Sequence, residues 1–267
     1  MGDRRPPVAL TVAGTDSGGG AGVAADLRTF CAHRVWGAVA VTAVTAQDTL
    51  GVQAVEPVAP AVIRAQIDSV LGDLGADAVK TGMLGSEAAV RAVAAGLRSR
   101  GAGPLVVDPV LRATTGRALL ADEALACLTE VLLPLAALVT PNLAEAAALA
   151  GVPAVVDRDG MVGAAERILR TGAGAVLVTG GHLVGERAAD CLLTPGAAPR
   201  WLVSDRIDDA GTHGSGCVLS AAVTARLALG DELGEACAAA KRYVTAAIAA
   251  SVRVGRGEAA VSPPACC

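Results

Sequence analysis

The chain of 267 residues has very few aromatic side chains and very few lysines. It contains one Phe, one Tyr and two Trp, so we do not expect the aromatic platforms on which single-stranded nucleic acids stack. Lys80 and Lys241 are its only lysines, and all its other Lys or Arg positions are arginine. Because lysine is so rare here, each of the two becomes a candidate for a specific role.

Long apolar runs are missing as well, although hydrophobic residues make up 53% of the chain. Charged residues, Gly or Pro interrupt every apolar stretch before it reaches the roughly 20 residues that a membrane-spanning helix needs. The P-loop pattern G-x-x-x-x-G-K-[ST] is absent too. The glycine cluster from Gly18 to Gly22 lacks both the lysine of a P-loop and the acidic ribose partner of a dinucleotide-binding loop. Two interpretations of that cluster stay open: a turn that shapes the first crossover, or backbone on which a small flat substrate lies.

Charge and cysteine content favour small-molecule chemistry inside the cell. The net charge is −4 and the basic residues are scattered, so the sequence shows no electrostatic footprint for nucleic acid. The seven cysteines are odd in number and lack metal-site spacing, and the N-terminus has no apolar signal-peptide segment. We therefore expect a reduced, cytoplasmic protein without nucleic-acid or membrane partners.

Short apolar runs alternate with helical patterns along the chain. Strands are predicted at 8–14, 35–46, 76–81, 104–110, 136–140 and 175–179, and a hairpin or edge-strand region at 191–194 and 201–205. Helices are predicted at 23–34, 61–74, 86–100, 122–133, 217–229 and 233–254. Two more are predicted between them, one that begins at 141–145 and one that ends at 166–170. This alternation predicts an α/β fold with a mostly parallel central sheet between two layers of helices. We expect a single domain over 8–255, a flexible N-terminus over 1–7 and a disordered tail over 256–267.

The segment from Gly211 to Cys217 precedes a long apolar helical pattern and has the character of an anion cradle. Its glycines allow close backbone approach, and the helix that follows offers unpaired N–H groups and a positive dipole end. A plain junction between a loop and a helix is the alternative. Cys217 at this helix start is expected to have a lowered thiol pKa, as a base, nucleophile or hydrogen-bonding group. A Cys-His hydrolase with His213 is a further alternative, although the sequence offers no third residue to orient the histidine.

Two carboxylates are candidates for a magnesium site. Asp108 ends an apolar strand and Glu145 lies in the first turn of a helix, so both side chains can reach the carboxyl edge of the sheet. Mg²⁺ prefers a few such oxygen ligands together with water and substrate phosphates. For Glu145 a structural alternative stays open, because Asn142 and Glu145 have the spacing of a helix capping box. Lys241 likewise has two interpretations: a cation directed at phosphates, or a side chain that extends from an apolar face to solvent.

Several segments, taken in order, resemble the hydroxymethylpyrimidine/phosphomethylpyrimidine kinase family of thiamine biosynthesis. The resemblance runs from about residue 8 to 255 and rests on the segments 13–22, 25–27, 42–47, 82–84, 108–110, 140–145, 180–182 and 211–217. It implies a ribokinase-like fold, a homodimer, and an ATP- and Mg²⁺-dependent kinase that phosphorylates 4-amino-5-hydroxymethyl-2-methylpyrimidine and then its monophosphate.

The same resemblance assigns roles to individual residues. The substrate side comprises Gly14, Ala21, Asp26, Gln47, Met83 and Val110, with Gln47 bonding the edge of the pyrimidine. The cradle is an anion hole formed by Gly214, Ser215 and Gly216, with Cys217 where related kinases have an aspartate base. Asn142, Thr179 and Lys241 correspond to the nucleotide side, and Asp108 and Glu145 to the magnesium and phosphate region.

Four positions depart from the family pattern. Thr179 replaces a common Lys, Asp48 replaces an Asn, Ala24 replaces a Gln, and Arg112 stands where an apolar or small residue is expected. Thr179 removes a cation from the nucleotide side, which Arg112 would partly replace. Two alternative functions therefore stay open: a pyridoxal or pyridoxine kinase on the same fold, and a catalytically weakened relative that binds pyrimidine or nucleotide.

Overall fold

The computed structural model describes residues 5–111, 122–181, 183, 185, 187–207 and 211–262. Eight of the strands form one sheet in the order β10-β9-β8-β7-β6-β5-β1-β2. The pairs from β2 to β8 are parallel, and the pairs β8–β9 and β9–β10 at one edge are antiparallel, so that β9 alone runs opposite to the other seven. The strands are β1 (Val8–Ala13), β2 (Trp36–Val41), β5 (Ala78–Thr81), β6 (Leu105–Val107), β7 (Ala136–Val139), β8 (Val176–Val178), β9 (Arg187–Leu193) and β10 (Arg200–Asp205). The mostly parallel sheet and the antiparallel edge region agree with the sequence prediction.

The strand order reverses at β1, which fixes where a ligand can bind. The chain runs from β1 to β2 on one side and then crosses to β5 on the other side, after which β6, β7 and β8 follow outward in sequence. In open α/β sheets ligands bind outside the carboxyl ends of the strands at such a switch point. The segments that follow β1, β5 and β6 therefore meet at this position.

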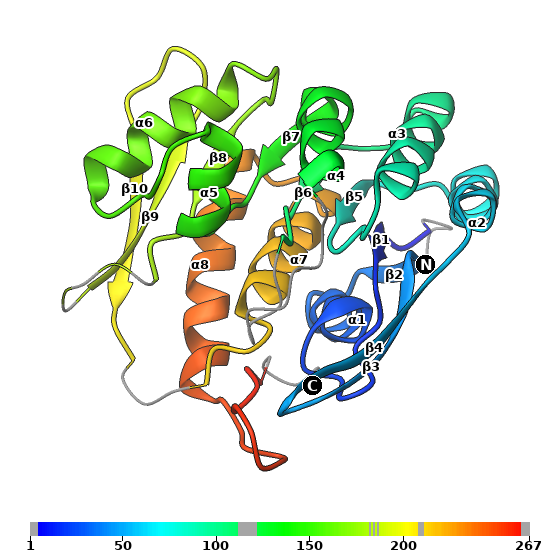
Figure 1. Ribbon diagram of the computed structural model, residues 1–267, viewed down its shortest axis with the longest axis horizontal. Coiled ribbons are helices and arrows are strands. Elements are labelled where there is room, and N and C mark those ends of the chain that lie inside the picture. The colour runs from blue at the N-terminus through cyan, green and yellow to red at the C-terminus, as the bar shows by residue number, and fades with distance from the viewer. Residues whose placement is uncertain are drawn as a thin grey trace.

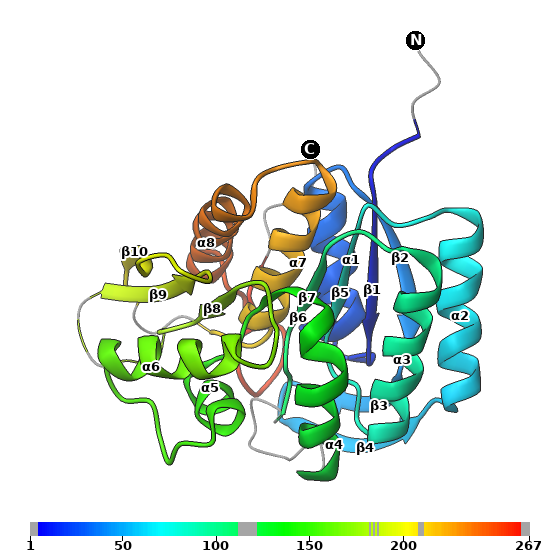
Figure 2. The same cartoon turned by 90° about the horizontal axis from the view of Figure 1, so that it is seen from above.

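Helices cover both faces of the sheet (Figure 1). One layer contains α1 (Gly22–Ala32), α7 (Ser215–Ala228) and α8 (Leu233–Ala249), which pack against one another. The opposite layer contains α2 (Pro60–Asp73), α3 (Glu87–Arg100), α4 (Asp122–Cys127), α5 (Leu143–Ala150) and α6 (Arg158–Leu169). Seen from above, the sheet lies between these two layers (Figure 2).

The core between the layers consists mainly of Ala, Val, Leu and Ile, with Phe30 among the largest fully buried side chains. One cluster joins the sheet to α2–α6 and the other two join it to α1, α7 and α8. Small side chains let helices and strands approach closely, so a core poor in aromatic residues still fills its volume.

The predicted strand over 35–46 is wrong in one respect. It divides at Thr42 into β2 and β3 (Ala43–Asp48), and β3 pairs with the unpredicted strand β4 (Gly51–Pro57) in a separate two-stranded hairpin. Asp48 closes that hairpin, because its Oδ1 accepts hydrogen bonds from Leu50 N at 2.8 Å and Gly51 N at 3.2 Å. The run of Ala, Val and Thr residues from 38 to 46 continues through Thr42 and hides the break.

Three smaller differences concern helices and the C-terminal end. The predicted helix over 122–133 consists of α4, a π-helical turn η1 (Leu128–Leu132) and a 3₁₀ turn η2 (Leu133–Leu135), and α8 ends at Ala249 rather than at 254. The prediction of a disordered tail is wrong for residues 256–262, since Ala260 and Val261 are buried. Among the residues that the structure describes, no helix has the length and apolar character needed to span a membrane.

Candidate active site

Two glycine-rich loops meet at the switch point. The first follows β1 and the second leads into α7, and the two backbones touch at Gly20 and Gly214. Gly214 has φ +83°, and a Cβ on it would lie 2.0 Å from the Gly20 carbonyl oxygen, so only glycine fits. The predicted cradle therefore lies directly against the predicted substrate loop.

The cradle has the geometry of an anion site. Gly214 is the N-cap of α7 and has no side chain to cap the helix. The N–H groups of the first turn, on Ser215, Gly216 and Cys217, therefore receive no acceptor from the cap residue. The Ser215 N–H bonds back to the Thr212 carbonyl oxygen at 3.0 Å, which closes the turn. The N–H groups of Gly216 and Cys217 and the positive end of the helix dipole then favour an anion.

The predicted lowering of the Cys217 thiol pKa is wrong. Burial raises the pKa of this thiol to about 12, and the carboxylates of Asp108 and Asp26 add to the rise against the opposing effect of Lys80. Removal from water outweighs the helix dipole, whose contribution is roughly 1 kcal/mol or less at a typical site. A thiol with this pKa is uncharged at neutral pH, which counts against a Cys-His nucleophile.

A buried charge network lies beneath the cradle. Lys80, on β5, is fully buried and its Nζ lies 2.6 Å from Asp26 Oδ1 and 3.9 Å from Asp108 Oδ2. The Thr11 hydroxyl donates to Asp26 Oδ2 at 2.6 Å, and the Ser220 hydroxyl, on α7, lies 2.9 Å from Asp108 Oδ2. Asp26 is thus fully buried and paired with Lys80, so any influence on a substrate passes through its neighbours.

Asp108 and Glu145 come together as predicted, and both are nearly buried. Burial, together with the Asp108 carboxylate, raises the pKa of Glu145 to about 8. Burial also raises the pKa of Asp108, in spite of Lys80 and the Ser220 hydroxyl. Two neighbouring buried carboxyl groups whose pKa values are raised favour a shared cation.

The alternative for Glu145 is also present in the structure. Glu145 Oε2 accepts from Asn142 N at 2.9 Å and Asn142 Oδ1 accepts from Glu145 N at 3.0 Å, which is a complete capping box. Glu145 Oε1 has a longer contact of 3.4 Å with Leu111 N. One carboxylate oxygen caps α5, and the other is directed to the loop after β6.

Four of the predicted substrate residues gather around the first glycine loop. A Cβ on Gly14 would lie 2.4 Å from the Met83 methyl carbon, so these two residues are in contact. Ala21 N donates to Asp16 Oδ2 at 2.8 Å, and Gln47 N donates to the Ser17 hydroxyl oxygen at 2.8 Å. Val110 follows Asp108 at the end of β6, where its N–H donates to the Asp108 carbonyl oxygen at 2.9 Å.

The predicted nucleotide residues lie beyond β7 and β8. Asn142 and Thr179 form a parallel bridge between the ends of the two strands. Lys241, on α8, is nearly buried, and its Nζ pairs with Asp190 Oδ2 at 2.8 Å, while Asp190 Oδ1 accepts from Gly180 N at 2.9 Å. Neither interpretation of Lys241 from the sequence foresaw this pair, which fixes the turn after Thr179. Arg112 and His182 lie outside the described residues.

Sequence reasoning missed four polar groups in and around the site. They are Asp16, which holds the first glycine loop, Lys80 and Ser220 in the buried network, and Arg206, which donates to the carbonyl oxygens of Gly181, Leu183 and Gly185. The rarity of lysine pointed to Lys80, and its position inside an apolar strand was the signal that a buried partner exists.

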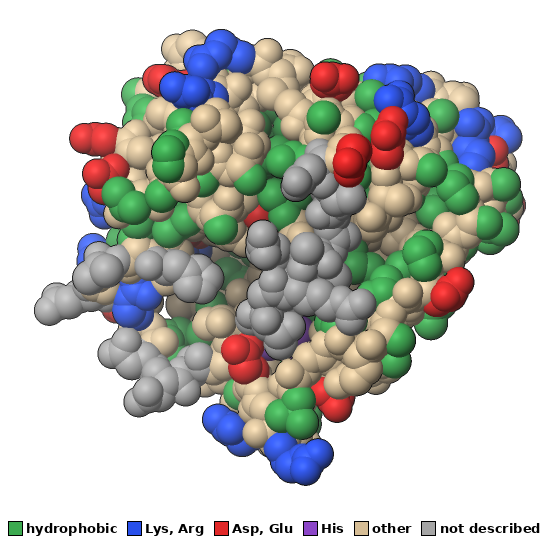
Figure 3. Space-filling view, in the orientation of Figure 1, with side chains coloured by type: hydrophobic (Ala, Val, Ile, Leu, Met, Phe, Trp, Pro, Cys, Tyr) green, Lys and Arg blue, Asp and Glu red, His purple; other side chains and the backbone are tan. Residues whose placement is uncertain are grey.

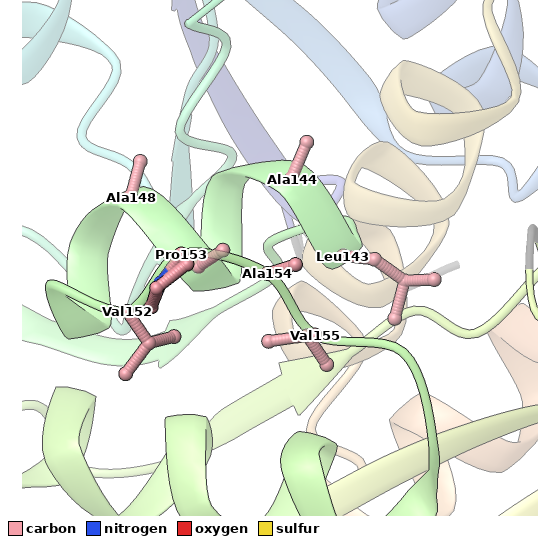
Figure 4. A pocket seen from close by; sticks show the side chains of 8 residues that line it. Leu143, Ala144, Ala148, Val152, Pro153, Ala154 and Val155 are labelled. Atoms are coloured by element: carbon pink, nitrogen blue, oxygen red, sulfur yellow. The ribbon is translucent and has the colours of Figure 1, made fainter.

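In the part of the chain that the structure describes, neither the face in Figure 3 nor the groove along α5 gathers the cations of a further phosphate site. On the described part of the face in Figure 3, Lys and Arg side chains are spread around the margin rather than gathered in a patch. A groove of about 440 Å³ runs along α5 (Figure 4), and the residues that line it are all apolar: Leu143, Ala144, Ala147, Ala148, Val152, Pro153, Ala154 and Val155. Among the described residues no three His, Cys, Asp or Glu side chains form a metal-binding cluster, so a cation at Asp108 and Glu145 would need further ligands from water and substrate.

Comparison with known proteins agrees with this geometry. The family model described as phosphomethylpyrimidine kinase matches residues 16–262. A hydroxymethylpyrimidine/phosphomethylpyrimidine kinase of Rhizobium meliloti is 51% identical over 251 residues, which cover 94% of each chain. The crystal structure of an ADP complex of Bacillus subtilis pyridoxal kinase has a TM-score of 0.92 and 40% identity, and the match covers 98% of each chain. The phosphomethylpyrimidine kinase structure from Clostridium difficile has a TM-score of 0.79 and 41% identity, with 90% of this chain and 98% of that chain covered. The chain therefore belongs to the phosphomethylpyrimidine kinase family.

Proposed function

We propose that this protein transfers the γ-phosphoryl group of ATP to 4-amino-5-hydroxymethyl-2-methylpyrimidine and then to the resulting monophosphate, as a step of thiamine biosynthesis. The observation that carries the proposal is the contact between the anion cradle and the substrate loop at Gly214 and Gly20. Asp108 lies near the cradle, because the hydroxyl of Ser220, on the helix that the cradle begins, donates to Asp108 Oδ2. Family membership supports the same reaction, because relatives such as the Rhizobium meliloti protein carry this name.

The substrate would lie on the first glycine loop. Gly14, Ala21 and Met83 offer a surface of backbone and small or flexible side chains that suits a flat heteroaromatic ring. Gln47 supplies an amide that can both donate to and accept from the edge of the pyrimidine. Val110 would close the pocket from the end of β6.

The nucleotide would lie toward α5 and the turn after β8. Asn142 and Thr179 stand at the ends of adjacent strands, and the Lys241–Asp190 pair fixes Gly180 between them and α8. We assign Lys241 an indirect role, because its charge is neutralised by Asp190. The ADP complex of the Bacillus subtilis pyridoxal kinase supports nucleotide binding on this fold.

Asp108 and Glu145 would hold Mg²⁺. The donor set fits, because carboxylate oxygens are the ligands that this ion prefers and because Glu145 Oε1 makes only a long contact within the chain. When bound, Mg²⁺ neutralises charge on the transferring phosphate oxygens.

The residues of this chain would contribute mainly positioning and charge stabilisation. The substrate hydroxyl, or its phosphate in the second step, attacks the γ-phosphorus in line while the bond from that phosphorus to the bridging oxygen breaks and ADP leaves; in the first step the hydroxyl proton passes to solvent. The N–H groups at the start of α7 bond to the equatorial oxygens. The Cys217 thiol, protonated in the free protein, lines this position and can hydrogen-bond to the attacking group. Positioning of this kind contributes up to roughly 7–11 kcal/mol in well-oriented reactions, so the reaction does not depend on a strong base.

Pyridoxal phosphorylation is the second candidate, favoured by the TM-score of 0.92 to the Bacillus subtilis pyridoxal kinase. Purified protein with ATP and Mg²⁺ should be assayed with the pyrimidine, its monophosphate and pyridoxal in parallel. We expect ADP release with both pyrimidines and a higher kcat/KM for them than for pyridoxal. Turnover of pyridoxal alone would reverse the assignment. Thermal stabilisation by ligands without ADP release would identify a binding relative instead.

We also propose that the protein is a homodimer that works in the cytoplasm. The free edge strand β2 and the hairpin β3–β4 expose Trp36, Val44 and Leu50, each more than half exposed, which is typical of a surface covered by a partner. Light scattering should give about twice the monomer mass, and Val44→Lys should reduce it. Cys127, Cys191, Cys217 and Cys237 are free thiols, which suits a reducing compartment.

A further inference from the structure

His213 lies where three segments far apart in the sequence meet. It belongs to the cradle, its ring lies against Gly20 of the first glycine loop, and its backbone pairs with Ala260 near the C-terminal end. A Cβ on Gly20 would lie 2.6 Å from His213 Cδ2, which shows how closely the ring packs there. The Val261 N–H donates to the His213 carbonyl oxygen at 3.1 Å and so fixes the backbone of the residue.

The side chain of His213 connects the cradle to the substrate loop through one carboxylate. His213 Nε2 lies 3.3 Å from Asp16 Oδ2, and the same oxygen accepts from Ala21 N at 2.8 Å. Asp16 Oδ1 accepts from Gly18 N at 2.8 Å. The Asp16 side chain is 3% exposed and that of His213 is 15% exposed, so water competes little for these bonds.

The His213–Asp16 hydrogen bond couples the position of the cradle to that of the substrate loop. Ala21 is the N-cap of α1 and one of the residues proposed to contact the pyrimidine, while Gly214 and Ser215 follow His213 directly in the cradle. A shift of the imidazole would therefore change the separation between the bound pyrimidine and the cradle N–H groups. Phosphoryl transfer depends on that separation, because the attacking oxygen must lie in line with the γ-phosphorus.

We propose that His213 is a positioning residue: through its hydrogen bond to Asp16 it sets the distance between the pyrimidine loop and the phosphate cradle. This inference rests on the proposed function. It assigns His213 no proton transfer and no contact with the substrate. The hydrogen bond to Asp16, rather than the basicity of the imidazole, is what the reaction requires.

The test compares His213→Ala with His213→Gln, whose side-chain amide can still donate to Asp16. We expect His213→Ala to lower kcat by about 10- to 100-fold, the scale of a misplacement of about 1 Å, while the KM for the pyrimidine changes less than about threefold. His213→Gln should recover most of this kcat. His33→Ala is the matched control, because His33 is the C-cap residue of α1 with its Nδ1 near the Thr29 carbonyl oxygen, and the kcat of this variant should equal that of the wild type.

A double-mutant cycle with Asp16→Asn separates a shared bond from two independent effects. If the two side chains act through their mutual bond, the double variant should be no more than about threefold slower than the slower single variant. If the losses of kcat in the two single variants multiply in the double variant, the inference is overturned. A His213→Gln variant as slow as His213→Ala would also overturn it, because this result would indicate proton transfer. A His213→Ala variant that unfolds at lower temperature but keeps its kcat would reduce the residue to a structural role. Wild-type protein that phosphorylates neither pyrimidine nor pyridoxal would overturn the proposed function itself, whereas an active wild type with an equally active His213→Ala variant would overturn only the inference.

Discussion

Replacing Lys80 by methionine tests the buried network most directly. The Lys80 and Asp26 side chains are both fully buried, and their charged atoms lie 2.6 Å apart. At an effective dielectric constant of about 20, this separation corresponds to a gross attraction of roughly 6 kcal/mol. Lys80→Met fills a similar volume but leaves Asp26 and Asp108 facing each other without a cation.

The net effect is smaller than the gross attraction, because the lost ammonium no longer has to be removed from water. Breaking a buried ion pair by removing one partner typically costs about 3–5 kcal/mol. For a domain of this size that loss corresponds to a fall in Tm of roughly 6–20 °C. Urea unfolding and calorimetry of the ligand-free protein measure both quantities.

Two further variants make the Lys80 result interpretable. Arg91→Met removes an exposed ion pair to Glu87 of 2.7 Å, and its urea denaturation midpoint should stay close to that of the wild type. The double variant Lys80→Met with Asp26→Asn removes both charges and keeps an acceptor for the Thr11 hydroxyl, so it should recover part of the loss. A Lys80→Met protein within about 1 kcal/mol of the wild type would refute the reasoning.

The other predictions concern the metal pair, the cradle and the cysteines. Glu145→Gln preserves the capping box, so stability should change little while the Mg²⁺ concentration for half-maximal activity rises about tenfold or more; an unchanged Mg²⁺ requirement would leave Glu145 as a cap only. Gly214→Ala should lower the free energy of unfolding by at least about 2 kcal/mol by urea titration, whereas Gly216→Ala, whose Cβ meets open space, should cost under about 1 kcal/mol. Burial raises the pKa of Cys237 to about 12, so the folded protein holds this proton after the unfolded chain has lost it: the contribution of Cys237 to stability should be level below pH 9 and fall between pH 9 and 12. Cys237→Ala should make that fall shallower in denaturation curves taken across this range, and the exposed Cys31→Ala should not.

The order of strands and helices was predictable because each buried strand carries a continuous apolar run and each helix carries a stripe. The same reasoning failed at Thr42, because nothing in the run of Ala, Val and Thr residues from 38 to 46 distinguishes one long strand from a strand that leaves the sheet and enters a hairpin. Residues 256–262 also escaped prediction. Long-range hydrogen bonds, such as that from Glu258 N to the Thr49 carbonyl oxygen, hold this segment in place. No local sequence pattern predicts such bonds.

The site was predictable as a set of segments but not as a set of partners. The pairing of the cradle with Asp108 followed from the topology of a parallel sheet. The pairs Lys80–Asp26, Lys241–Asp190 and His213–Asp16 join residues 54, 51 and 197 positions apart, and such partners are set by tertiary packing. For Cys217 the local rule gave the wrong sign, because the helix start was visible in the sequence and the depth of burial was not.

The strand order also gives this protein two built-in optical reporters. Trp36 lies on β2 and Trp201 on β10, the two outermost strands of the eight-stranded sheet. Trp36 is 58% exposed, whereas the Arg158 guanidinium carbon lies 4.8 Å from the centroid of the Trp201 ring. Because their surroundings differ, we expect the two indoles to differ in fluorescence emission. Variants with a single tryptophan would report separately on the opposite margins of one sheet. Identical denaturation midpoints from the two would mean that the sheet unfolds as one unit, and separate midpoints would reveal which margin opens first.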